Sequence, residues 1–288
     1  MAEIPAAMVV KLRKITGQGM MDCKNALQEA NGDIEQAVQI LRKKGLAVLS
    51  KRAERETSQG LVVSKSTANG NTSAMATLCC ETDFVARSDD FITAAQALAD
   101  FALVCPADQG TDNILETSLD VRKFSDILTE TVSKTGEKIQ VGDYTKYKLD
   151  GPGLISTYIH FNGKVGTMVE IETSDENVAA VDILKKTASD IAIHITATKP
   201  LALDKDGLSP QIIEQEKAVY REQVKDKPSN ITEKIVEGKM KKFYTENCLL
   251  DQLFVKDDSK TVAQVLADAA KQAGGHAKIK RFVRFEVG

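Results

Sequence analysis

A spacing pattern that occurs twice is the feature of this sequence that most restricts its fold. Gly60 precedes the pair Asn69-Gly70 by a fixed interval, and the same interval recurs farther along the chain. There it separates Gly153 from Asn162-Gly163. Each Asn-Gly pair lies between apolar segments, which is a strong signal for a β-hairpin, and helical patterns follow. The repetition indicates an internal duplication into two related subdomains, each a sheet with helices on one face, so the predicted fold class is α+β.

The N-terminal part of the chain shows three short amphipathic patterns. The first ends at the glycine-containing segment 16–19, and the second covers residues 21–31. The third is opened by the capping residue Asp33 and is expected to end at Gly45. Together they predict a three-helix module, and the charge run at 51–56 that follows is interpreted as a solvated linker helix.

Residues 198–247 interrupt the second subdomain. Their apolar residues recur seven apart on both sides of a turn expected at Lys227-Pro228-Ser229, which predicts an antiparallel coiled-coil hairpin. Such a hairpin could pair between subunits or pack on its own core. The predicted domains are a three-helix module over 1–55, one core subdomain over 56–145, a second over 146–197 and 248–288, and the inserted hairpin over 198–247.

Charge and hydropathy exclude two classes of partner. The chain has 38 Lys and Arg against 41 Asp and Glu, a net charge of −3, so no global positive field exists to hold nucleic acid. No apolar stretch approaches the ~20 residues of a membrane span, and no signal peptide follows Met1. We therefore expect a soluble, cytoplasmic protein that binds neither nucleic acid nor membrane.

The sequence contains no recognisable catalytic or metal-binding motif. Its five cysteines include no C-x-x-C pair, and its three histidines are far apart. Cys79 and Cys80 lie in an apolar strand pattern, which favours buried structural thiols over nucleophiles. His194 is interpreted as a core or cap residue, whereas His160 precedes a turn and could contact a partner. We predict a protein that is not an enzyme and has no metal site or cofactor.

The segment 81–91 (ETDFVARSDDF) places an aromatic residue, Phe84, in the connection after the first hairpin. The corresponding segment of the second repeat, 174–177, has none. Connections run over the surface, and Ser88 followed by two aspartates is a typical helix start. Phe84 is therefore either a core residue or an anchor for a pocket on another protein.

Several segments together resemble the bacterial elongation factor Ts family, the guanine-nucleotide exchange factors of elongation factor Tu. They occur in the family's order along nearly the whole chain: Leu12-Arg13, Thr16 to Lys24, Gly32-Asp33, Glu81 to Arg87, His194 with Pro200, Lys234 to Gly238, and Arg284 to Gly288. The resemblance implies a ubiquitin-associated-like N-terminal module, a core of two subdomains and an inserted coiled-coil hairpin.

The resemblance also implies a partner and the residues that bind it. In such proteins the Phe of the Thr-Asp-Phe-Val stretch wedges into the GTPase domain of elongation factor Tu and disturbs its magnesium site, which promotes GDP release during translation elongation. The partner-binding residues carried over to this sequence are Thr82, Asp83, Phe84, Val85, Met20, Met21 and His160. Direct nucleotide binding is not expected, and both a homodimer and a heterotetramer with the partner stay open.

A rival hypothesis is a passive binding module, in which a ubiquitin-associated-like domain is attached to an oligomeric scaffold without exchange activity. Catalytic turnover distinguishes the two, because an exchange factor works at substoichiometric amounts. A small-molecule enzyme is a more distant alternative, since the sequence lacks the residue constellations that such chemistry needs.

Overall fold

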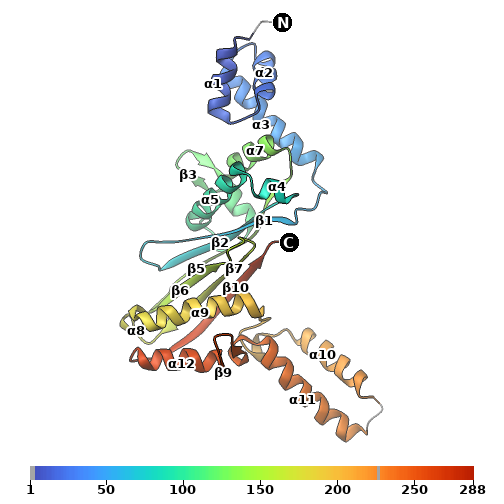
Figure 1. Ribbon diagram of the computed structural model, residues 1–288, viewed down its shortest axis with the longest axis vertical. Coiled ribbons are helices and arrows are strands. Elements are labelled where there is room, and N and C mark those ends of the chain that lie inside the picture. Colours follow the sequence, from blue (N-terminus) through green and yellow to red (C-terminus); the bar gives the residue numbers. More distant parts are fainter. Residues whose placement is uncertain (1–3, 226–227) are drawn as a thin grey trace. The chain divides into compact units, whose positions relative to one another are not determined.

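The computed structural model describes residues 4–225 and 228–288 (Figure 1). The chain divides into two compact units that both combine helices with a β-sheet, which confirms the predicted α+β class. Unit 1 comprises Met1–Tyr147, Ile159–Gly166 and Phe285–Gly288, and unit 2 comprises Lys148–Tyr158 and Thr167–Arg284. This division places the N-terminal helices and the first sheet in one unit. The finer domain boundaries expected from the sequence stay a prediction.

The N-terminal helices form as their capping residues predict. Their bounds are α1 (Ala6–Thr16), α2 (Met20–Glu29) and α3 (Ile34–Lys51). Gly17 ends α1 in the left-handed conformation, at φ +67°, and its N–H donates to the carbonyl of Arg13 at 2.8 Å. Asp33 caps α3, its carboxylate accepting the N–H of Gln36 at 3.0 Å. The three helices bury a small apolar cluster that includes Leu12 and Leu27.

The third helix is longer than the sequence predicts. The expectation that it ends at Gly45 is wrong, because α3 continues through Lys51. Gly45 is instead buried where α3 packs against α7 (Phe124–Thr135), and a Cβ there would overlap the backbone oxygen of Thr129. A glycine in mid-helix therefore serves close helix packing here. The linker helix expected at 51–56 is wrong as well, because α3 ends at Lys51 and residues 52–55 form turns and a bend. Nor is this run purely solvated, since Arg52 pairs with Glu81.

The first sheet has the strand order β1-β2-β5, with bounds β1 (Gln59–Ser66), β2 (Thr72–Cys80) and β5 (Ile139–Lys148). β1 and β2 are antiparallel around the predicted turn, where Gly70 has a φ of +73°. The other elements of this part of the chain are α4 (Asp83–Ala86), α5 (Asp89–Val104), α6 (Thr111–Glu116), β3 (Ser118–Leu119) and β4 (Arg122–Lys123). The core joins the sheet to α5 and α7, and the rings of Phe101 and Phe124 lie 5.5 Å apart in it.

The second sheet has the strand order β10-β7-β6, with the second strand of the hairpin at its centre, as β2 is in the first sheet. The elements of this part are β6 (Gly153–Ile159), β7 (Val165–Thr173), α8 (Glu176–Ala180), α9 (Asp182–Thr198), the 3-10 helices η1 (Lys205–Gly207) and η2 (Leu249–Asp251), β8 (Leu253–Phe254), β9 (Asp257–Thr261), α12 (Val262–Gln272) and β10 (Ala277–Glu286). Apolar residues of α9, α12, β7 and β10 form one buried cluster, which places both helices against the sheet (Figure 1).

His194 is a core residue, as the sequence predicts. It is fully buried in α9, where its Nδ1 accepts the N–H of Val255 at 3.2 Å. Nε2 therefore carries the proton and donates to Oε1 of Gln252 at 2.9 Å. Burial lowers the pKa of this histidine below its usual value, so it stays neutral at neutral pH.

A helical hairpin projects from unit 2, formed by α10 (Pro210–Gln223) and α11 (Ser229–Asn247) (Figure 1). Ser209 caps α10 ahead of Pro210, which suits the first turn of a helix. The ion pair of Arg221 with Glu233, 3.2 Å long, joins the end of α10 to the start of α11. Lys227 of the expected turn lies outside the described residues. Among the helices that the structure describes, none is long and apolar enough to cross a membrane.

Candidate functional site

The segment Thr82–Val85 is ordered by its own capping interactions. Thr82 ends the extended chain after β2, and its Oγ1 accepts the N–H of Val85 at 3.3 Å to begin the one-turn helix α4. Ser88 then caps α5 in the same way by accepting the N–H of Phe91 at 3.3 Å. Two short-range caps therefore fix the backbone on both sides of Phe84.

Phe84 lies outside the core. Its side chain is 85% exposed, whereas Val85 packs in part against the first core cluster and Ala86 is buried. Full burial of a phenylalanine is worth about 1.5–3 kcal/mol, and this protein gains little of that from Phe84. The residue is therefore available to fill a pocket on another protein, as an anchor residue must be.

Thr82 is held by Glu137, a residue that the sequence analysis did not single out. One carboxylate oxygen of Glu137 accepts the Thr82 hydroxyl at 2.6 Å, and the other accepts the Thr82 N–H at 3.0 Å. Glu137 follows Gly136, which ends α7 in the left-handed conformation at φ +72°. The C-terminal end of α7 is thus tied directly to the start of α4.

Glu81 anchors the same connection to the end of α3. Nη1 of Arg52 lies 2.9 and 2.7 Å from the two carboxylate oxygens of Glu81, and the N–H of Lys138 donates to one of them at 2.7 Å. Burial alone would oppose the charge, but the Lys138 N–H and the Arg52 guanidinium together lower the pKa of Glu81. Glu81 is therefore ionised at neutral pH and bridges three segments of unit 1.

Asp83 remains accessible beside Phe84. Its carboxylate is 3.0 Å from the guanidinium of Arg87, one helical turn along, and both side chains are largely exposed. An exposed pair of this kind contributes little to stability, about 0–1 kcal/mol, so either charge can exchange its partner at small cost.

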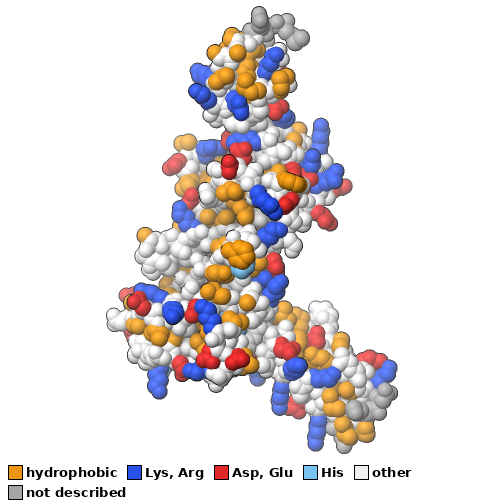
Figure 2. Space-filling view, viewed as in Figure 1, with side chains coloured by type: hydrophobic (Ala, Val, Ile, Leu, Met, Phe, Trp, Pro, Cys, Tyr) orange, Lys and Arg blue, Asp and Glu red, His pale blue; other side chains and the backbone are white. Residues whose placement is uncertain are grey.

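Met20 and Met21 begin α2 and present a second exposed apolar surface. They are 45% and 64% exposed. The face of the N-terminal helices seen in Figure 2 carries hydrophobic side chains interspersed with lysine and arginine. The preceding residue Gln18 is buried and donates from Nε2 to the carbonyl of Glu130 in α7, at 3.5 Å. The loop that precedes both methionines therefore lies against α7.

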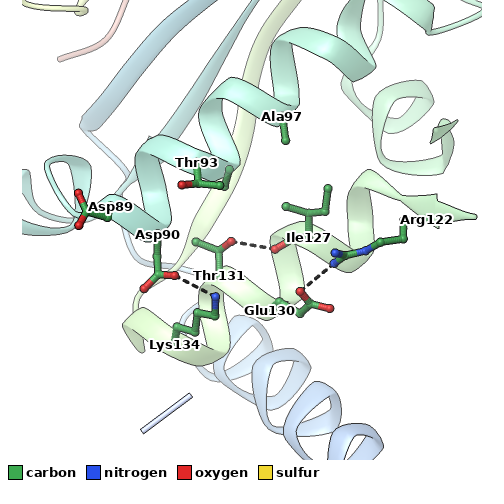
Figure 3. A pocket seen from close by; sticks show the side chains of 10 residues that line it. Asp89, Asp90, Thr93, Ala97, Arg122, Ile127, Glu130, Thr131 and Lys134 are labelled. Carbon is green, nitrogen blue, oxygen red and sulfur yellow. Dashed lines mark hydrogen bonds and ion pairs between the residues drawn. The ribbon is translucent and has the colours of Figure 1, made fainter. Parts of the chain in front are cut away.

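A pocket of about 330 Å³ lies between α5 and α7 (Figure 3). The ion pair of Lys134 with Asp90, 2.9 Å long, joins α7 to α5 at its edge, and Arg122 lies 2.8 Å from Glu130 on the α7 side. These four charged side chains pair with one another, so none of them is left to bind a charged substrate in the pocket. The Lys134 pair also fixes the start of α5 against α7, close in sequence to α4.

His160 lies in the loop between β6 and β7, which belongs to unit 1. The loop is bound to β1, since the carbonyl of Gly163 accepts the N–H of Val62 at 2.7 Å. The ring of the half-buried His160 is 4.4 Å from that of Phe161, which is 92% exposed. The sequence analysis missed Phe161, although it directly precedes the Asn162-Gly163 turn signal, and turns run over the surface.

The structure places the seven residues expected to bind the partner in unit 1. Glu130 lies in the middle of α7, and Glu137 lies in the turn that follows the helix. The first contacts the loop before Met20, and the second holds Thr82. The structure thus connects the loop before Met20 to the turn that carries Phe84 through α7 and the turn after it. The sequence alone did not reveal this connection.

The thiols of Cys79 and Cys80, near this site, are unreactive because their pKa values are raised. Burial, reinforced by the nearby Glu137 carboxylate, raises the pKa of Cys80 to about 12, and burial also raises the pKa of Cys79. Both are protonated at neutral pH, in agreement with the predicted structural role. No group of three or more His, Cys, Asp and Glu residues suited to a metal ion is found in the described ranges 4–225 and 228–288.

Comparison with known proteins gives consistent similarities over the chain. The family model described as Elongation factor TS matches residues 81–288, which is more than half of the sequence. Elongation factor Ts from a Nitratiruptor species is 41% identical over 287 residues, covering 99% of this chain and 93% of that relative. The proteins of the same name from Trichlorobacter lovleyi and Nitratidesulfovibrio vulgaris are 40% and 38% identical, with 99% of this chain covered in each case and 93% and 96% of the relatives.

Proposed function

The chain belongs to the elongation factor Ts family, and from this premise we propose that it is the guanine-nucleotide exchange factor of elongation factor Tu in translation elongation. The observation that carries the proposal for this chain is the exposure of Phe84 on a turn with a fixed backbone. A ring that packs against a partner must stand outside its own core while its direction is determined. Phe84 meets both conditions.

The proposed mechanism is differential binding. A GTPase of this kind holds GDP through backbone amides and a magnesium ion, so spontaneous release is slow. If the exchange factor binds the nucleotide-free GTPase more tightly than the GDP form, reciprocity requires that it weaken GDP binding by the same factor. Phe84 would gain contacts mainly in the nucleotide-free state, by displacing elements next to the magnesium site.

The required free energy exceeds what one ring supplies. A thousandfold acceleration takes about 4 kcal/mol, at ~1.4 kcal/mol for each factor of ten. Burial of Phe84 gives at most about 3 kcal/mol, so other contacts must add the rest. Asp83 is placed to act on the same region of the partner, and Met20, Met21 and His160 would supply further contact area.

The proposal extends to the architecture. We assign the N-terminal helices to a ubiquitin-associated-like module over 1–55 and the two sheets to a duplicated core, which their equivalent strand orders support. The hairpin over 198–247 is an insertion whose ends meet, because the N–H of Leu201 donates to the carbonyl of Asn247 at 2.9 Å. Elongation factor Tu is the proposed partner in the cytoplasm, without a cofactor, direct nucleotide binding, nucleic acid or membrane.

Stopped-flow release of a fluorescent GDP from elongation factor Tu tests the proposal. The wild-type protein should release GDP from many equivalents of the GTPase, and Phe84→Ala should slow release by at least about tenfold, as loss of a well-buried anchor predicts. The fold should be unchanged, because the ring is exposed. A wild-type protein that binds the GTPase without turnover would instead identify a passive binding module.

A further inference from the structure

We propose that Glu137 is a positioning residue for nucleotide exchange: its carboxylate holds Thr82 and thereby sets the direction in which Phe84 leaves the protein. This inference rests on the proposed function, because it concerns how the same turn acts. It assigns a role to a residue outside the Thr82–Val85 stretch, one that does not itself have to touch the partner.

The geometry of Thr82 makes the carboxylate necessary. The Thr82 hydroxyl has one hydrogen and donates it to Glu137 at 2.6 Å, so its lone pairs face the N–H of Val85 that it caps. The second carboxylate oxygen takes up the backbone N–H of Thr82 at 3.0 Å. One carboxylate therefore holds both the side chain and the backbone of Thr82, two residues before Phe84.

Neighbouring contacts hold Glu137 and the connection together. Lys138, the next residue, donates its N–H to Glu81 at 2.7 Å, and its Nζ donates to the carbonyls of Ala53 and Arg55 at 2.6 and 3.0 Å. The turn after α7 is therefore fastened to the end of α3 as well as to the start of α4. A displacement of α4 would have to break several hydrogen bonds at once.

The same helix also sets the distance to the second contact surface. Gln18, in the loop before Met20, donates to Glu130 seven residues before Glu137. Residues 130–135 of this span belong to α7, which rises about 1.5 Å per residue, and Glu137 lies in the turn that follows Gly136. Through α7, Glu137 thus fixes Phe84 relative to the two methionines, which a rigid two-point contact with one GTPase domain requires.

The test uses Glu137→Ala and Glu137→Gln in the full chain, with GDP release measured over a range of exchange-factor concentrations. Glutamine keeps the volume of the side chain, but a neutral amide cannot accept both Thr82 hydrogens, since its NH₂ group is a donor. Glu116→Ala is the matched control, because Glu116 is an exposed carboxylate of unit 1 whose ion pair, 2.6 Å from Lys123, is remote in sequence from α4.

The maximal release rate of both Glu137 variants should fall at least about tenfold, the effect expected of losing a charge-assisted hydrogen bond. The concentration for half-maximal release should change less than about twofold, because the contact area is unaltered. Glu116→Ala should behave as wild type. Hydrogen exchange of the Thr82 amide, read without the partner, should become faster only in the Glu137 variants. If Glu137→Ala lowers the thermal stability, Glu137→Gln alone decides the outcome.

Combination with Phe84→Ala separates this inference from the proposed function. If Glu137 acts through the ring, Glu137→Gln should slow release no further in the Phe84→Ala background. A second, independent tenfold loss in that background would overturn the positioning role, and so would a wild-type maximal rate in Glu137→Gln. If Phe84→Ala alone leaves release unchanged, the proposed role of the ring fails instead.

Discussion

Gly45 provides a sharp test of how the N-terminal helices are held. In α3 this residue faces α7, and a Cβ added to it would overlap the backbone oxygen of Thr129 while lying 3.2 Å from the Cβ of Ser133. A backbone oxygen cannot move aside by changing a rotamer. Gly45→Ala must therefore push α3 away from α7, which also carries the hydrogen bond from Ser133 Oγ to the carbonyl of Leu41, 3.1 Å long.

The magnitude follows from two opposing effects. Alanine is favoured over glycine inside a helix by about 0.5–1 kcal/mol. Overpacking a close contact costs about 1–3 kcal/mol, so we expect a net loss of up to about 2.5 kcal/mol from Gly45→Ala. Gly238 is the matched control, since it lies inside α11 and a Cβ there would meet nothing within 4 Å. Gly238→Ala should therefore stabilise its helix by about 0.5–1 kcal/mol.

Native-state hydrogen exchange measures both effects locally. Amides of α3 and α7 should exchange faster in Gly45→Ala, and amides of α11 should exchange more slowly in Gly238→Ala. Because Gln18 and Met20 depend on the same docking, Gly45→Ala should also raise the concentration needed for half-maximal GDP release. Equal protection gains in the two variants would refute the packing argument for Gly45.

Two further predictions concern single side chains. The folded-state pKa of Glu81 is lowered, so its ion pair with Arg52 stabilises the protein above the ordinary glutamate pKa of about 4.3, and this stability is lost as the pH falls through the lower folded value. Glu81→Gln should therefore flatten the pH dependence of the free energy of unfolding below about pH 4.3. An unchanged dependence would contradict this role of the pair. Phe161→Ala should change the free energy of unfolding by less than about 0.5 kcal/mol, because the ring is exposed. It should lower the affinity for elongation factor Tu in a binding titration if the loop of His160 is a contact. An unchanged affinity would remove this loop from the interface.

The elements that local patterns determine could be predicted from the sequence. Asp33 at a cap, Gly70 in the turn between β1 and β2 and the apolar period of the hairpin helices each act within a few residues. The exposure of Phe84 left two readings open, because a ring in a surface connection can fold back onto the core or stay outside. Only the three-dimensional packing of Val85 and Ala86 distinguishes them.

The residues that support the site could not be predicted because their partners are distant in sequence. Arg52 is 29 positions from Glu81, and Glu137 is 55 positions from Thr82. A charge run and a lone glutamate after a helix give no local sign of such pairing. The same holds for Gly45, which looked like a helix end because its true constraint, the close approach of α7, is a tertiary contact.

The most direct test of the account is to compare affinities for the nucleotide-free and the GDP-bound forms of elongation factor Tu, for the wild-type protein and for Phe84→Ala. The account predicts that the wild type prefers the nucleotide-free form and that Phe84→Ala loses at least about tenfold of that preference, with a smaller change toward the GDP form. An equal loss of affinity for both forms would contradict it, because the ring would then contribute binding without driving nucleotide release.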